Sequence, residues 1–241
     1  MVIEETLTQG KLVKRYKRFL ADITLENNLV TAHCPNSGSM KGLVNPGNSV
    51  WISTSTNKAR KLPYTLEMIQ VDGVYVGVNT RKPNQIVAHA LKQKKIKSLS
   101  QYNAIREEVK YGTNSRIDIL LQQESLPDAY IEVKNVTLKE GDAALFPDAV
   151  TSRGTKHLNE LINMKKIGAR AIMFYLVQRN DCRFFSPARK IDPLYAQTLE
   201  KAMDAGVEVM IYPCSVSPQE IKLEVTNPLP FKTEVHETNT E

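Results

Sequence analysis

The stretch Tyr130-Ile-Glu-Val-Lys-Asn-Val136 alternates apolar and polar residues and carries a carboxylate and an amine two positions apart. Such alternation is typical of a β-strand, in which side chains two residues apart share a face. We therefore expect Glu132 and Lys134 to project together, while Ile131 and Val133 point to the opposite side. A charge among β-branched residues is costly unless it is paired or binds a metal. The stretch thus predicts a sheet with a chemical site on it.

A second apolar run, Arg116-Ile-Asp-Ile-Leu-Leu121, places Asp118 in the same kind of setting. If its strand pairs beside the first, Asp118, Glu132 and Lys134 converge. Two carboxylates, with carbonyl and water oxygens, suit Mg²⁺ or Mn²⁺, and a neighbouring lysine positions water or offsets charge on a phosphoryl group. We predict Asp118, Glu132 and Lys134 as catalytic residues, with Asp118 and Glu132 as metal ligands.

A structural interpretation of these charges stays open. Glu108 is a candidate fourth catalytic residue, but its strand alternates charges, as an exposed sheet edge also does. Glu132 and Lys134 are equally compatible with an ion pair on a solvated strand face. The residues therefore predict a site and leave open whether it is an enzyme's.

The sequence around these strands predicts a mixed α/β domain. The predicted helices cover 83–93, 155–167 and 193–203, and the predicted strands cover 105–111, 116–122, 130–136, 169–178 and 207–212. Asp192-Pro193 is a typical helix start, and Gly168 and Gly206 are typical helix ends. The order α-β-β-β-α-β-α-β predicts a central mixed sheet covered by helices.

The first 80 residues have a different pattern. Short apolar runs at 12–25, 29–33, 50–53, 66–69 and 74–78 are separated by turn formers such as Asn45-Pro-Gly-Asn48. Five short strands in so short a segment predict a small β-barrel. We place a barrel domain at 1–80, the α/β domain at 81–232 and a disordered polar tail at 233–241.

Basic residues gather in two places. Between Asp72 and Glu107 the chain has no acidic residue but seven basic ones, namely Arg81, Lys82, Lys92, Lys94, Lys95, Lys97 and Arg106. Near the N-terminus, Arg15, Lys17 and Arg18 surround Tyr16, a mixture that can contact phosphates and stack on a base. We predict these four residues as DNA contacts, with a plain solvated strand face as the alternative.

The segment His33-Cys-Pro-Asn-Ser-Gly-Ser-Met40 predicts a turn whose backbone amides hold an anion. Asn36 and Ser37 add donors, Lys41 follows directly, and we predict all three as DNA-binding residues. The segment is not a P-loop, since G-x-x-x-x-G-K-[ST] is absent, and an ordinary surface turn is the alternative.

Composition excludes several classes of protein. The 241 residues include 32 Lys and Arg against 26 Asp and Glu, and the resulting charge of +6 permits a polyanionic partner. Apolar runs such as 171–177 are far shorter than the roughly 20 residues of a membrane span. Cys34, Cys182 and Cys214 are too few and too far apart for a disulfide framework or a cysteine-rich zinc site. We expect a cytoplasmic protein without a membrane partner.

Several segments, taken in their joint order and spacing, resemble the sugar fermentation stimulation protein A family. They run over nearly the whole chain and comprise Arg15-Tyr-Lys-Arg-Phe-Leu-Ala-Asp22, 33–40, Ser115-Arg-Ile-Asp118, Tyr130-Ile-Glu-Val-Lys134, Phe146-Pro-Asp-Ala-Val-Thr151, Arg153-Gly-Thr-Lys-His-Leu158 and Phe185-Ser-Pro-Ala-Arg189.

The resemblance implies an OB-like barrel joined to a restriction-endonuclease-like domain, and DNA as partner. It carries over Asp118 and the Glu132-x-Lys134 pair as nuclease elements, with Glu108 as the upstream carboxylate. Many nucleases of that superfamily place the upstream acid on the first helix, and the predicted helix 83–93 has none.

Two functions follow. The first is a DNA-binding protein with a Mg²⁺-dependent nuclease site. The second is a non-catalytic DNA-binding regulator of sugar metabolism genes, with the nuclease-like domain as a scaffold. A homodimer is expected only because two-fold symmetric dimers are the most common oligomers of soluble proteins. DNA against RNA and single against double strands are left open.

Overall fold

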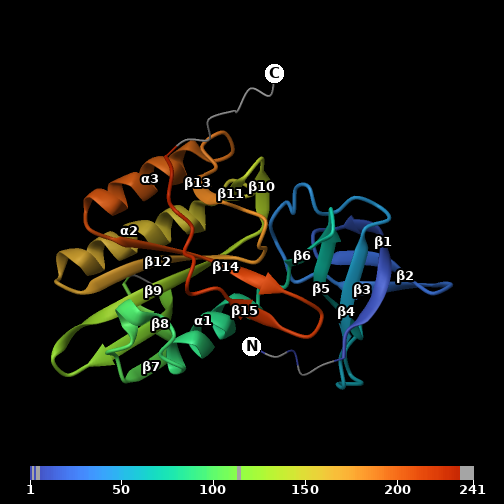
Figure 1. Cartoon of the computed structure of the whole chain (residues 1–241), viewed down its shortest axis with the longest axis horizontal. Helices are drawn as coiled ribbons and strands as arrows, with labels where there is room; N and C mark the ends of the chain where they lie inside the picture. Colours follow the sequence, from blue (N-terminus) through green and yellow to red (C-terminus); the bar gives the residue numbers. More distant parts are fainter. Residues whose placement is uncertain (2, 4–5, 113–114, 234–241) are drawn as a thin grey trace.

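The computed structural model describes residues 1, 3, 6–112 and 115–233, which form a β-barrel and a larger layered domain (Figure 1). Apart from Thr233, the predicted tail at 233–241 lies outside the described residues. No helix in the described part of the chain is long and apolar enough to cross a membrane.

The barrel closes by a parallel contact between its third and fifth strands. Its strands are β1 (Thr8–Tyr16), β2 (Leu20–Leu25), β3 (Asn28–His33), β4 (Ser49–Thr54), β5 (Tyr64–Val71) and β6 (Val74–Gly77). The order β3-β2-β1-β4-β5-β6, with the added β3–β5 pairing, makes a closed five-strand barrel, and β6 extends β5 as a hairpin. Leu12, Ile23, Ile52 and Leu66 fill the interior. The predicted OB-like barrel is confirmed.

The prediction of one strand over 12–25 is wrong, because the chain reverses inside it. Lys17 and Arg18 adopt left-handed backbone conformations, with φ of 45° and 65°, and the Phe19 N–H donates to the Lys17 carbonyl at 2.7 Å. Such conformations usually need Gly, Asn or Asp, none of which occurs there. The turn therefore had no sequence signal.

The layered domain is built on a mixed sheet, as predicted, but the sheet has six strands where the sequence predicted five. Its order is β15-β14-β12-β9-β8-β7, in which β9, β12 and β14 run parallel to one another. These strands are β7 (Ala104–Tyr111), β8 (Ser115–Gln123), β9 (Leu126–Val136), β12 (Arg170–Val177), β14 (Glu208–Val216) and β15 (Ile221–Leu223).

The sequence patterns missed four short strands. β10 (Leu138–Glu140), β11 (Ala143–Phe146) and β13 (Phe184–Pro187) form a separate three-stranded sheet, and β15 is the fourth. Each has only three or four residues, too few to show alternation. A 3₁₀ turn also covers Lys97–Leu99.

Helices cover both faces of the main sheet. On one face, Ile86 of α1 (Lys82–Lys92) belongs to the same core as Ile131 and Val133 of β9. On the other, Leu158 of α2 (Ser152–Lys166) and Leu199 of α3 (Pro193–Asp204) pack with the β12 side chains.

The starts of α2 and α3 are set by side-chain caps. The Asp192 carboxylate accepts the Tyr195 N–H at 2.9 Å, with Pro193 in the first helical position, which confirms the predicted start of α3. Thr151 caps α2 by accepting the Gly154 N–H at 3.0 Å. This cap begins α2 at Ser152, three residues before the predicted start at 155.

Candidate active site between the barrel and the sheet

A cleft of about 350 Å³ lies between the barrel and the layered domain. The barrel contributes loop 36–38, and the layered domain contributes Asn84, Lys134 and the start of α2. Asp148 ties the two sides together, because its carbonyl accepts the Ser39 hydroxyl at 2.7 Å and its carboxylate accepts the Met40 N–H at 2.9 Å. The barrel loop is therefore held against the layered domain.

A glycine permits this close approach. A Cβ added at Gly38 would lie 2.5 Å from the Asp148 carboxylate oxygens, closer than real Cβ contacts. A larger residue at this position would displace either loop 36–38 or the Asp148 carboxylate that holds it.

Asp118 lies where the β8–β9 ladder stops. The last recorded pair on this side is Ile119 with Ile131, and beyond it the Asp118 carboxylate replaces a backbone partner by accepting the Val133 N–H at 2.7 Å. Its other oxygen accepts the Asn84 amide at 2.9 Å. Burial, together with the charge of Glu132, raises the pKa of Asp118 to about 6.

Glu132 is the most buried charged group of the site, with 2% of its surface exposed. Its Oε1 accepts Lys134 Nζ at 2.6 Å and also contacts His157 Nδ1. Burial acts to raise the pKa of Glu132, but the His157 hydrogen bond and the Lys134 charge outweigh it and hold this pKa below its usual value. Oε2 is buried and has no hydrogen-bond partner among the described residues. One oxygen is thus fixed while the other keeps its lone pairs.

His157 supports Glu132 from α2. Its Nε2 lies 3.3 Å from Arg153 Nε, which can only donate, and its Nδ1 contacts Glu132 Oε1 and lies 3.3 Å from Lys134 Nζ. The tautomer that accepts from Arg153 and donates to the Glu132 carboxylate carries its proton on Nδ1. The Nδ1 proton then points at Glu132 Oε1. Arg153 therefore fixes the tautomer with which His157 orients the carboxylate.

Glu108 lies at the edge of this group. It falls between the pairs Glu107–Ile119 and Val109–Ile117, which places it opposite Asp118, and it has a left-handed φ of 55°. Its Oε1 is 3.4 Å from the same Asn84 amide that donates to Asp118. The first helix thus contributes an amide that bridges two carboxylates instead of an acid of its own. Glu108 is exposed, unlike Glu132.

Two of the predicted DNA contacts, Arg15 and Asn36, hold in place the barrel loop 36–39 at the cleft, which we call the cleft loop. The Arg15 guanidinium donates to the carbonyls of Asn36 and Gly38 at 2.8 Å each and to that of Ser39 at 3.2 Å. The Asn36 amide donates to the Val78 carbonyl at 3.1 Å, and its oxygen accepts the Gly38 N–H at 2.9 Å. Their side chains therefore shape loop 36–39.

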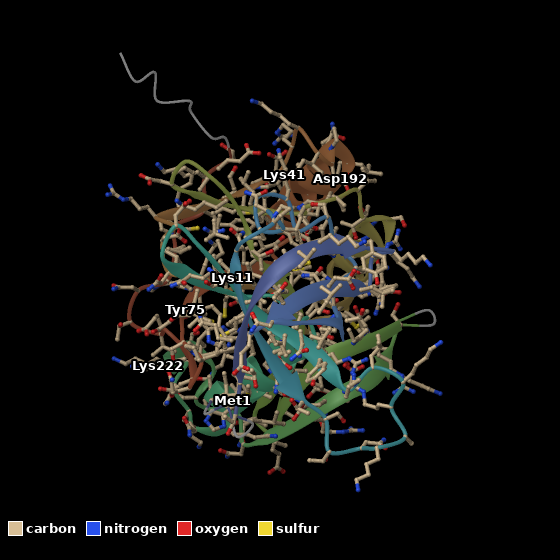
Figure 2. All side chains as sticks on the ribbon, turned by 90° about the vertical axis from the view of Figure 1, so that its right-hand side faces the viewer. Met1, Lys11, Lys41, Tyr75, Asp192 and Lys222 are labelled. Atoms are coloured by element: carbon tan, nitrogen blue, oxygen red, sulfur yellow. The ribbon has the colours of Figure 1, made fainter. Side chains whose placement is uncertain are left out.

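The remaining predicted DNA contacts differ in whether their side chains are bonded to a neighbour or exposed to solvent. The Tyr16 hydroxyl donates to Asp22 at 3.1 Å. The Nζ atom of Lys41, which is labelled in Figure 2, lies 3.1 Å from Glu140 Oε1. Lys17 and Arg18 are exposed in the β1–β2 turn, and Ser37 is exposed in the cleft.

Sequence reasoning missed Asn84, Arg153 and His157. His157 follows Arg153 by one helical turn and lies beside the core residues Leu158 and Leu161, so a polar residue on a buried helix face was the available signal. Asn84 had none, because its importance arises from a contact 34 residues along the chain.

The same architecture occurs in known proteins. The SfsA N-terminal OB domain matches residues 13–78, and the sugar fermentation stimulation protein RE domain matches residues 81–220. The chain belongs to the sugar fermentation stimulation protein family. The homolog from Paramagnetospirillum magneticum is 53% identical over 218 residues, which cover 90% of this chain and 92% of that protein.

Two further similarities agree with the family assignment. The homolog from Geobacter metallireducens is 52% identical over 225 residues and covers 92% of this chain and 97% of its own length. The solved structure of Pyrococcus furiosus SfsA in complex with Ca²⁺ has a TM-score of 0.88 at 24% identity, covering 96% of this chain and 98% of that one. This last similarity shows the shared fold.

Proposed function

We propose that this chain binds nucleic acid, with DNA as the expected partner, and hydrolyses phosphodiester bonds at the cleft with the help of Mg²⁺. The observation that carries the proposal is the convergence of Asp118, Glu132 and Lys134, with Glu132 Oε2 buried and unpartnered. A buried carboxylate oxygen without a donor is costly, and a cation removes that cost.

The residues present fit a divalent cation. Asp118 and Glu132 would hold it, and the elevated pKa of Asp118, caused by burial and by Glu132, reflects a repulsion that a cation relieves. The similar Pyrococcus furiosus protein was solved with Ca²⁺, which shares the preference of Mg²⁺ for oxygen ligands. A bound Mg²⁺ supplies positive charge that offsets the phosphoryl oxygens.

The protein's own groups supply the remaining chemistry. Lys134 lines the cleft beside Glu132, where its ammonium group orients water or offsets charge that develops on the phosphate. His157 and Arg153 keep Glu132 in one orientation. Ser37 offers a hydroxyl to a phosphate from the barrel side of the cleft.

Cleavage assays test the proposal. Labelled single- and double-stranded DNA and RNA are incubated with the protein in Mg²⁺, Mn²⁺ or EDTA, alongside Glu132→Ala, Lys134→Ala and the control Glu107→Ala. Glu107 is an exposed carboxylate whose partner is Lys92. We expect metal-dependent cleavage that is lost in the first two variants and kept in the control, with binding retained throughout. Cleavage in EDTA, or cleavage insensitive to Glu132→Ala, would contradict the proposal.

One observation favours the non-catalytic regulator of sugar metabolism genes. Among residues 1, 3, 6–112 and 115–233, no group of three or more His, Cys, Asp or Glu side chains gathers as a metal site, so Asp118 and Glu132 would hold a cation without a third such side chain. In that case the protein binds DNA with a salt-sensitive affinity but leaves it intact with every metal. The same assays separate the two functions.

A further inference from the structure

The outer face of the barrel carries a row of aromatic rings. Tyr16 pairs across β1–β2 with Leu20, and Leu20 pairs across β2–β3 with His33. Residues directly opposite one another share a face, and the alternate residue Ala21 points into the barrel core. Phe19, in the β1–β2 turn, stacks on His33 with ring centroids 6.4 Å apart and planes 27° apart. We call Tyr16, Phe19 and His33 the aromatic row.

The aromatic row contains an exposed ring and a polar atom without a hydrogen-bond partner among the described residues. The Phe19 side chain is 44% exposed, an apolar ring that the barrel core does not use. His33 Nδ1 is buried and has no hydrogen-bond partner among the described residues. One member therefore presents a ring face to solvent and another keeps a polar atom without a partner.

Cations surround the aromatic row. Lys17 and Arg18 precede Phe19 and are exposed. The Arg60 guanidinium donates at 3.2 Å to Thr65, the strand partner of His33. Burial, followed by the charges of Arg81 and Arg60, lowers the pKa of His33, so that its ring is neutral at neutral pH. Neutral rings beside cations suit a polyanion that carries flat bases.

The aromatic row leads directly to the cleft. His33 precedes Asn36 of the cleft loop by three residues, a distance of at most about 11 Å along an extended chain. The Thr80 N–H donates to the Pro35 carbonyl at 3.2 Å and brings the start of α1 to the same place. A nucleic-acid strand that is bound at the aromatic row therefore reaches the cleft within a few nucleotides.

We infer that the aromatic row stacks the unpaired bases of a single-stranded nucleic acid whose backbone continues into the cleft. Bases in a duplex already stack on each other, so an exposed protein ring accepts unpaired bases only. This inference rests on the proposed function for the destination of the strand. It adds a substrate class, since it makes the bound region single-stranded.

Binding measured without metal tests the aromatic row separately from catalysis. Fluorescence anisotropy in EDTA compares a labelled oligothymidylate, an abasic strand of equal length and charge, and a blunt duplex. The variants are Phe19→Ala, Phe19→Tyr and Leu29→Ala, the last removing a 66% exposed side chain elsewhere on the barrel. Phe19→Ala is expected to weaken oligothymidylate binding about 5- to 100-fold, the loss of one stacked base.

The controls define the outcome. Phe19→Tyr and Leu29→Ala should bind oligothymidylate as the parent does, and Phe19→Ala should leave abasic and duplex binding unchanged. Unchanged oligothymidylate binding by Phe19→Ala, or an equal loss on the abasic strand, overturns the inference. If the inference fails in this way while Glu132→Ala abolishes cleavage, the proposed nuclease function is still supported. If oligothymidylate binding depends on Phe19 as expected but no metal supports cleavage, only the proposed nuclease function is contradicted.

Discussion

The candidate active site and the barrel surface organise their charges in opposite ways. Asp118, Glu132 and Lys134 are largely enclosed and bonded to one another or to neighbouring helices. On the barrel, Lys17 and Arg18 are exposed in a turn beside a half-exposed ring. This contrast has a physical reason: a reaction centre needs fixed geometry, whereas contact with a polyanion needs only positive charge on side chains long enough to meet the phosphates.

Replacing the lysine of the site should produce the largest effect. Lys134→Met keeps the length of the side chain and removes its charge, so we expect cleavage to slow by about 10²- to 10³-fold. Binding to DNA in EDTA should change little, since one largely enclosed cation is removed while the barrel surface is intact. Single-turnover cleavage and anisotropy measure the two quantities, and a parallel loss of both would erase the proposed contrast.

Removing the orienting histidine should weaken metal binding. His157→Leu abolishes the donor to Glu132 Oε1, and losses of such supporting groups typically cost about 10- to 100-fold in metal affinity. His157→Asn keeps a donor near the Nδ1 position and should restore much of that affinity. Titration calorimetry with Mg²⁺ or Ca²⁺ alone provides the measurement. If His157→Leu and His157→Asn bind the metal equally tightly, the hydrogen bond from His157 does not support metal binding and its role is packing only.

The buried Asp118 predicts a pH-dependent stability. Its pKa is raised from 3.8 to about 6 by burial and by Glu132, so the folded metal-free protein holds this proton more tightly than the unfolded chain. The resulting stabilisation is complete below about pH 4 and is lost as the pH rises through about 6. Asp118→Asn should therefore be more stable than the parent near pH 8, by up to about 3 kcal/mol, and nearly equal to it near pH 4.

Urea unfolding in EDTA at these two pH values checks the prediction for Asp118. A variant that is less stable than the parent near pH 8 would show that losing one of the two hydrogen bonds accepted by Asp118, from the Val133 N–H or the Asn84 amide, outweighs the relief of the buried charge.

The smallest effects are expected from replacing Arg15, which lies in β1, and Arg18, which lies in the β1–β2 turn. Arg15→Ala removes donors to three loop carbonyls and should destabilise the protein by about 1–3 kcal/mol. Arg18→Ala should change stability by less than about 0.5 kcal/mol and reduce the salt slope of DNA binding by about 1. Thermal unfolding and binding at several salt concentrations distinguish them, and equal behaviour would show that Arg15 is also only a surface charge.

The sequence predicted the strands of the site well but their partners poorly. Glu132 and Lys134 share a face because alternation is a local property of one strand, and their 2.6 Å contact follows from it. Asp192-Pro193 fixed a helix start for the same reason, since the capping Asp192 carboxylate and the Tyr195 N–H that donates to it lie three residues apart. The turn at Lys17 and Arg18 escaped because its left-handed conformations occur at residue types that seldom adopt them.

The sequence is enough to predict a barrel, a mixed α/β domain and a pair of charges on one strand, because each of these depends on neighbours within a few residues. The contacts by which Asn84 bridges Asp118 and Glu108, and by which Arg153 and His157 orient Glu132, arise from the packing of the folded chain. The same packing places Phe19 on His33. Apart from the Arg153–His157 contact within α2, these contacts join residues that are 14 to 34 positions apart. Packing of whole helices and strands sets such distances, and no local pattern records them.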